Sequence, residues 1–105
     1  MTDKLLVLST SGSEAEAQKI AQELVQRRLA ACVNIVPRIQ SVYRWEGEVE
    51  TAEDFLLIIK TTKARSAEVQ AAIRELHSYD LPECIVVSIE TGSEKYLKWI
   101  EDSVG

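Results

Sequence analysis

The side chains best suited to binding a metal ion gather in one short stretch of the sequence. His77, Asp80, Glu83 and Cys84 offer an imidazole, two carboxylates and a thiol, which are common ligands of zinc and copper. Their spacing matches no fixed metal-binding motif, so two interpretations stay open. Either His77 and Glu83 hold a cation, or His77 ends a helix while Glu83 caps a loop or pairs with a basic residue of a neighbouring subunit. Cys84 fits a core position better than a ligand position.

Signatures of most enzyme classes are missing from the sequence. It has no Gly-rich phosphate loop, no Cys-x-x-Cys pair, no His-Glu-x-x-His motif and no nucleophile elbow, and it has one histidine. Residues 10–13 (TSGS) precede an expected helix and could bind an anion, although such loops usually only cap the helix. We therefore expect a protein that is not an enzyme and requires no cofactor.

Acidic and aromatic residues between positions 43 and 54 could also contact a ligand. Strand alternation would place Glu48, Glu50 and Asp54 together on one face, which we expect to be solvated rather than catalytic. Aromatic side chains could stack on a planar ligand, although packing contacts are commoner for such residues. The aromatic residues concerned are Tyr43, Trp45 and Trp99.

These residues lie on or beside a long β-hairpin, predicted from Cys32 to Thr62 with its turn at Glu46-Gly47. At about 3.3 Å per residue, its first arm, Cys32 to Trp45, would extend roughly 45 Å, against a radius of gyration of roughly 13 Å for a compact chain of this length. Much of the hairpin must therefore project from its own core. The apolar residues of one parity, expected on one face of the arm, are Val33, Ile35, Ile39, Tyr43 and Trp45.

A projecting two-stranded ribbon is unstable alone, because it buries little surface and leaves both edges unpaired. Its aromatic tip favours burial in another subunit, so the 32–62 hairpin predicts a homo-oligomer. Pro37 cannot donate a ladder hydrogen bond and should lie at a bulge or edge. The alternative is a bent hairpin that folds back within one subunit.

The remaining segments predict an α+β, ferredoxin-like βαββαβ sandwich with an extended central hairpin and a C-terminal helix. The apolar runs at 4–9, 55–59 and 84–89 are typical of strands buried on both faces. Ser13 and Glu16 form a capping-box pattern before a helix that should run to Arg28 or Leu29. A second helix is expected over 64–77 and a third over 96–104, and the candidate caps are Thr62 or Ser66 and Ser93.

Length and composition favour one domain over residues 1–105. The net charge of −5 and the lack of a Lys/Arg cluster argue against a nucleic-acid or anionic-membrane partner. Met1 to Leu8 lacks the pattern of a signal peptide, so a cytoplasmic location is expected. The two cysteines, Cys32 and Cys84, lie in apolar β patterns and should be buried, reduced thiols.

Five segments together resemble the divalent-cation tolerance protein CutA family: RRLAACVNIVP, SVYRWEGEVE, LLIIKTT, LHSYDLPE and YLKWI. The resemblance spans most of the chain. It implies a ferredoxin-like fold assembled as a homotrimer whose long hairpins pair between subunits. It also implies a link to tolerance of divalent metals, with copper binding in some members.

The family motif of His, Pro, Tyr, two variable residues, Pro and Glu matches residues 77–83, with Ser78 in place of the usual proline. The resemblance therefore implies His77 and Glu83 as metal ligands, for copper or zinc. A cysteine that contributes to metal binding in some members corresponds to Ser9, and Arg38 stands where many relatives have glycine.

The sequence thus predicts a cytoplasmic homotrimer that binds divalent metal ions without catalysis. The alternative is a trimeric small-molecule-binding or signalling module with clefts between subunits. An acylphosphatase on the same fold is less well supported, because the expected arginine loop is missing.

Overall fold

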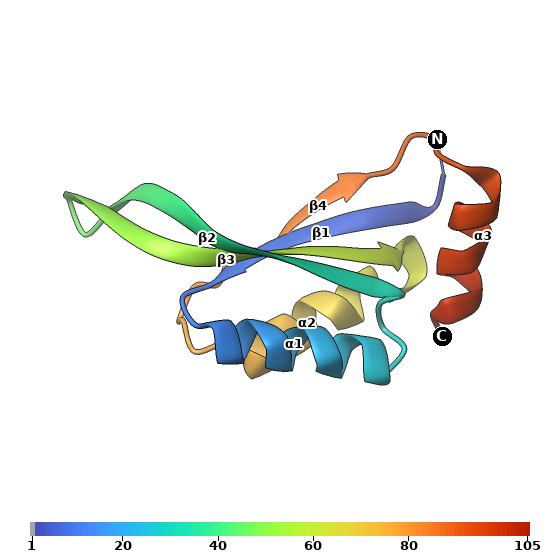
Figure 1. Ribbon diagram of the computed structural model, residues 1–105, viewed down its shortest axis with the longest axis horizontal. Coiled ribbons are helices and arrows are strands. Elements are labelled where there is room, and N and C mark those ends of the chain that lie inside the picture. Colours follow the sequence, from blue (N-terminus) through green and yellow to red (C-terminus); the bar gives the residue numbers. More distant parts are fainter. Residues whose placement is uncertain (1) are drawn as a thin grey trace.

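Four strands form one antiparallel sheet, and two helices cover one of its faces (Figure 1). The computed structural model describes residues 2–105, so Met1 of the expected domain lies outside it. The element order confirms the predicted α+β, ferredoxin-like fold with its C-terminal helix, and the strands lie in the order β2-β3-β1-β4. The elements are β1 (Lys4–Ser11), α1 (Glu14–Gln26), β2 (Cys32–Trp45), β3 (Glu48–Thr62), a 3-10 turn η1 (Lys63–Arg65), α2 (Ser66–Leu76), β4 (Ile85–Ser88) and α3 (Glu94–Ser103).

The helix ends follow local capping, with three departures from expectation. Ser13 and Ser93 cap α1 and α3 as predicted, but neither Thr62 nor Ser66 caps α2 through its side chain. Helix α1 stops at Gln26, because Arg28 adopts a left-handed backbone with φ of 59°. The capping box is only half formed: the Ser13 hydroxyl accepts from the Glu16 amide at 3.2 Å, whereas the Glu16 side chain turns elsewhere.

The long hairpin projects from the domain as predicted, and Figure 1 shows its tip far from both covering helices. The molecule measures 44 × 25 × 22 Å, and most residues of the hairpin beyond the bulge are exposed. We call residues 39–53 the ribbon. At its tip the side chains of Val42 and Val49 are 65% and 63% exposed, so a single chain leaves apolar surface in solvent there.

A β-bulge at Pro37-Arg38 corrects the expected face assignment. Val36 pairs with Leu56 and Ile39 with Asp54, so the first arm uses two residues where the second uses one. Arg38 takes a φ of 60°, which suits the glycine that the family resemblance implies at this position. The bulge inverts the alternation, so Val33 and Ile35 face the helices, whereas Ile39, Tyr43 and Trp45 share the opposite face with Asp54.

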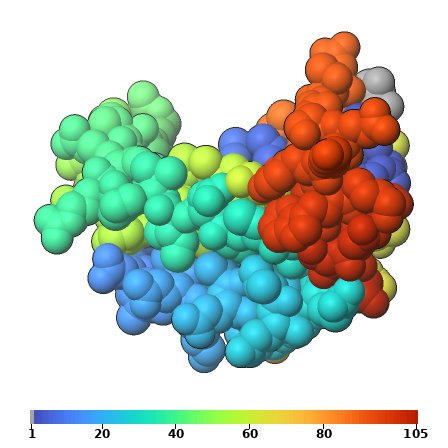
Figure 2. All heavy atoms as spheres, turned by 45° about the vertical axis from the view of Figure 1, so that its right-hand side comes forward, coloured from blue at the N-terminus to red at the C-terminus, as the bar shows by residue number. Residues whose placement is uncertain are grey.

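The strands expected to be buried on both faces are covered on one face only. Odd-numbered residues of β1 and β3 pack against α1 and α2, whereas the even-numbered apolar residues are half-buried. Strand β4, expected over 84–89, is shorter and exposed along its length. Figure 2 shows the ribbon and α3 standing at opposite ends of this open face. The uncovered apolar residues of this face include Leu6, Leu8, Leu56, Ile58, Ile85 and Val87.

No helix formed by residues 2–105 is both long and apolar enough to cross a membrane. Cys32 and Cys84 are free thiols, but both are partly accessible rather than fully buried as expected. Cys84 packs against the main core, and burial raises the pKa of its thiol, which keeps it protonated near neutral pH. The expected role of Cys84 as a core residue therefore agrees with its surroundings.

Two buried serines on the helix-facing side of β1 predict opposite effects on stability. Ser9 is fully buried and its hydroxyl has no hydrogen-bond partner among residues 2–105, whereas the Ser11 hydroxyl donates to Glu16 at 2.7 Å. Ser9→Ala should therefore raise the free energy of unfolding by about 1 kcal/mol, and Ser11→Ala should lower it by about 1–2 kcal/mol. Chemical denaturation of both variants measures this. Equal destabilisation by the two substitutions would contradict the assignment.

Candidate functional site

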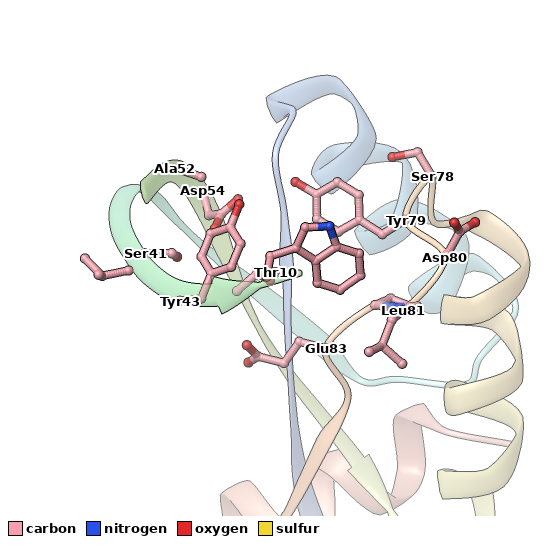
Figure 3. A pocket seen from close by; sticks show the side chains of 13 residues that line it. Thr10, Ser41, Tyr43, Ala52, Asp54, Ser78, Tyr79, Asp80, Leu81 and Glu83 are labelled. Atoms are coloured by element: carbon pink, nitrogen blue, oxygen red, sulfur yellow. The ribbon is translucent and has the colours of Figure 1, made fainter. Parts of the chain in front are cut away.

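A cavity of about 870 Å³ lies between the ribbon and the loop that follows α2 (Figure 3). The ribbon forms one wall, residues 78–83 form the other, and Thr10 of β1 lies between them. Such a volume lies within the usual range for small-molecule sites. The residues that line the cavity are Thr10, Ser41, Val42, Tyr43, Trp45, Ala52, Asp54, Ser78, Tyr79, Asp80, Leu81, Pro82 and Glu83.

His77 holds the loop of residues 78–83 in place but does not line the cavity. Its side chain is fully buried where α2 ends. Nε2 lies 2.6 Å from the Thr10 carbonyl oxygen, and Nδ1 lies 3.0 Å from the Tyr79 amide nitrogen. Because a carbonyl only accepts and an amide N–H only donates, Nε2 carries the proton and Nδ1 accepts. Both ring nitrogens therefore join β1 and the loop.

Glu16 fixes the same loop from the first turn of α1. One carboxylate oxygen accepts from the Ser78 amide at 2.9 Å, and the other accepts from the Ser11 hydroxyl at 2.7 Å and lies 3.7 Å from Nδ1 of His77. Burial opposes ionisation of Glu16, but the hydrogen bonds from Ser11 and Ser78 outweigh it, so the pKa of Glu16 is lowered. The carboxylate thus joins β1, α1 and the cavity loop.

Tyr79 continues the contact into the cavity. Its ring lies against His77 with centroids 4.7 Å apart, and its phenol oxygen reaches the backbone at Gly12. A Cβ at position 12 would stand 2.5 Å from that oxygen, so only glycine fits there without movement of the phenol. Burial, reinforced by the Asp54 carboxylate, raises the pKa of Tyr79, which keeps the phenol protonated and able to donate.

Asp54 shares a face of β3 with Glu48 and Glu50 as predicted, but the prediction that this face is solvated is wrong for Asp54. Asp54 is only 6% exposed, and Oδ1 has no hydrogen-bond partner among residues 2–105. It directly precedes Phe55, where β3 passes from the ribbon into the core. The sequence signal for this burial is the position of Asp54 directly before the apolar run that begins at Phe55.

The cavity is acidic and has no basic side chain in its lining. Asp54, Asp80 and Glu83 line it together, and none of the three forms an ion pair with any residue in 2–105. Figure 3 shows the Glu83 carboxylate extending from the loop toward the ribbon side. This arrangement favours cationic ligands over anionic ones.

The predicted metal ligands are brought near one loop, but not into one cluster. Across residues 2–105 no group of three His, Cys, Asp or Glu side chains lies close enough to hold a metal ion. Glu83 is exposed at the cavity, whereas a metal at His77 would have to replace one of its two hydrogen bonds. Metal binding by His77 and Glu83 therefore stays a prediction.

The loop 10–13 and the aromatic residues of the sequence prediction differ in their relation to the cavity. The hydroxyls of Ser11 and Ser13 are used within the chain to organise the start of α1. Tyr43 and Trp45 line the cavity, whereas Trp99 lies elsewhere, beside Tyr96 on α3. Tyr79 completes the aromatic lining, a role that the sequence, which places it in a loop, does not predict.

Comparison with known proteins gives a consistent result. The family model described as CutA1 divalent ion tolerance protein matches residues 5–103. A protein of Thermus thermophilus named divalent-cation tolerance protein CutA is 43% identical over 95% of this chain and 97% of its own length. A chloroplastic CutA protein of Arabidopsis thaliana is also 43% identical, over 94% of this chain and 54% of its own length.

Solved structures agree with these sequence relatives. CutA from Xylella fastidiosa superposes with a TM-score of 0.97 at 38% identity, covering 99% of this chain and all of that one. The periplasmic divalent cation tolerance protein CutA from Archaeoglobus fulgidus superposes with a TM-score of 0.94 at 39% identity, covering 97% and 99% of the two chains.

The contacts of Glu16 predict a pH-dependent contribution to stability. Because its folded pKa is lowered, its contribution is fully present above the ordinary value of 4.5 and is lost as the pH falls through the folded pKa. Glu16→Gln should lower the free energy of unfolding by about 1–3 kcal/mol at pH 7, through loss of two hydrogen bonds to a charged acceptor. The difference from wild type should shrink below pH 4.5.

Urea denaturation from pH 3 to 7 measures this difference. Glu14→Gln removes the same charge from the same helical turn and should have a much smaller effect, since Glu14 makes no such contacts in the described chain. A Glu16→Gln effect that stays constant across that range would refute the proposed role of the carboxylate.

Proposed function

The chain belongs to the CutA1 divalent ion tolerance protein family, and from this premise we propose that it is a single-domain, homotrimeric, non-catalytic protein that binds divalent cations such as copper or zinc in the cytoplasm. The observation that carries the proposal is the acidic, base-free lining of the cavity in a chain of this family. The named function of the Thermus thermophilus relative supports the cationic ligand.

His77 and Glu83 are the candidate ligands for the cation, which is here the bound cargo and not a cofactor. Imidazole nitrogen and carboxylate oxygen suit zinc and Cu(II), whereas Ser9 offers no thiolate for Cu(I). The donor set of one chain is small, so water or the carboxylates of Glu46, Glu48 and Glu50 from another subunit would complete the coordination. Binding by so few protein ligands should be weak.

The proposed assembly is supported by the apolar surface that a single chain leaves uncovered. The open face of the sheet and the ribbon tip are both apolar, and β2 and β4 are the two edge strands. Contact between copies would bury these surfaces and pair the exposed edges. The number three is the one that the family resemblance implies.

A small-molecule-binding or signalling module is the second candidate, favoured by the volume of the cavity and its aromatic lining. The acidic residues make an anionic metabolite a poor ligand for this cavity. A thermal-shift screen separates the candidates: stabilisation by organic molecules without any response to Cu²⁺ or Zn²⁺ favours the module.

The oligomer prediction depends on the tip of the ribbon. Wild-type protein should sediment at three times 11.8 kDa at micromolar concentration, and Val49→Asp should shift it to the monomer mass because it places a charge in the proposed apolar contact. Thr51→Asp, which adds the same charge on the same strand at a position that is already polar and exposed, should retain the trimer. A folded wild-type monomer would refute the assembly.

The metal prediction is tested by calorimetric titration with CuCl₂ and ZnCl₂ at neutral pH. Glu83→Gln should weaken binding by about tenfold or more, because it removes one of few ligands, and His77→Ala/Glu83→Ala should abolish it. Glu90→Gln, at an exposed carboxylate outside the cavity, should leave the isotherm unchanged. Circular dichroism checks that the double variant is folded. An isotherm equal to wild type in the double variant would show that the ligands are assigned wrongly.

A further inference from the structure

Asp54 has a buried carboxylate oxygen for which residues 2–105 supply no hydrogen-bond partner. Its side chain is more than nine-tenths buried, it lines the cavity, and Oδ1 makes no hydrogen bond within residues 2–105. An ionised carboxylate buried in this way is costly unless a cation or a hydrogen-bond donor meets it. A ligand that brings both a positive charge and an N–H donor would satisfy it.

The walls around Asp54 are suited to an organic cation. Figure 3 shows Tyr43 beside Asp54 on the ribbon side and Tyr79 across from them on the loop. Trp45 also lines the cavity, and aromatic faces attract ammonium groups through their quadrupole. Leu81 adds apolar surface on which an alkyl chain can pack.

The other charged residues of the lining point to the same class of ligand. Asp80 and Glu83 add negative charge, and no lysine, arginine or histidine lines the cavity. An anionic ligand would meet three carboxylates and no counter-charge there. A neutral ligand would leave the Asp54 charge uncompensated.

A bare metal ion fits this part of the cavity poorly. Aromatic carbons supply no coordination bonds, and no trio of metal-binding side chains lies together in residues 2–105. The volume of about 870 Å³ also far exceeds the space that one ion requires. An ammonium group on a carbon chain uses both the carboxylate and the aromatic and apolar walls.

We propose that the cavity between the ribbon and residues 78–83 binds an aliphatic primary amine in its ammonium form, with N–H donated to Asp54 and the alkyl chain packed against Trp45 and Leu81. The binding is non-covalent. The inference gives a ligand class to the small-molecule candidate described above. It does not depend on metal binding by His77, which does not line the cavity, although Glu83, the other proposed metal ligand, does line it.

Calorimetry with 1,5-diaminopentane tests the proposal at neutral pH and low salt, with 1,5-pentanediol as the uncharged control of the same length. Wild type should bind the diamine and not the diol. Asp54→Asn should weaken binding by about tenfold or more, and Trp45→Leu should weaken it by several-fold. Glu53→Gln removes the same charge from the adjacent residue, which is exposed and outside the lining, and should change affinity by less than about twofold.

The outcomes separate this proposal from its alternatives. Equal weakening by Asp54→Asn and Glu53→Gln, or equal binding of the diamine and the diol, would overturn it. The proposal would also be overturned if wild type did not bind the diamine and Asp54→Asn changed the sedimenting mass. The carboxylate would then serve a contact between copies. Diamine binding by a wild-type protein that does not bind Zn²⁺ would support the amine site while refuting metal binding.

Thermal unfolding gives a second readout that does not require ligand. Asn preserves the shape of Asp54 and removes its unpaired charge, so Asp54→Asn should melt at a temperature equal to or above that of wild type. Added diamine should raise the melting temperature of wild type and leave that of Asp54→Asn unchanged. Stabilisation of both proteins to the same extent would count against Asp54 as the binding group.

Discussion

Burial of the sheet against α1 and α2 is the contact on which the rest of the molecule depends. It uses the odd-numbered residues of β1 and β3, which form the core with α1 and α2. The even-numbered residues of the same strands are largely apolar as well, but residues 2–105 form no second layer of helices to cover them. The fold therefore leaves one apolar face open, and the ribbon extends beyond the core from which it starts.

The cavity results from two parts of the chain that are held independently. The ribbon side is set by the register of β2 on β3 and by the bulge that turns Ile39 and Tyr43 to the face of Asp54. The loop side is set by Glu16 and His77, which tie the backbone of residues 78 and 79 to α1 and β1. Because each wall has its own support, a ligand between them would meet groups that are already in place.

Periodicity was sufficient to predict the elements, since β2 has the bounds that alternation gave and the projecting half of the hairpin begins where β3 becomes polar. It could not predict the faces beyond Pro37, because a bulge inverts alternation and leaves no periodic trace of its own. A second limit is that periodicity does not reveal contacts between segments that are distant in sequence. The burial of Asp54 depends on such a segment, the loop after α2. The contact of Glu16 with Ser78 is another example, since Ser11 and Ser78 replace the local partner expected for Glu16.

Gly12 connects the start of α1 to the far wall of the cavity without lining it. A methyl group there would stand 2.5 Å from the phenol oxygen of Tyr79, so the size of residue 12 sets how far that ring can enter. The turn before α1 thus acts as a spacer for a ligand-facing aromatic side chain. A substitution at Gly12 would therefore change the size of the cavity while every side chain that lines the cavity keeps its chemical identity.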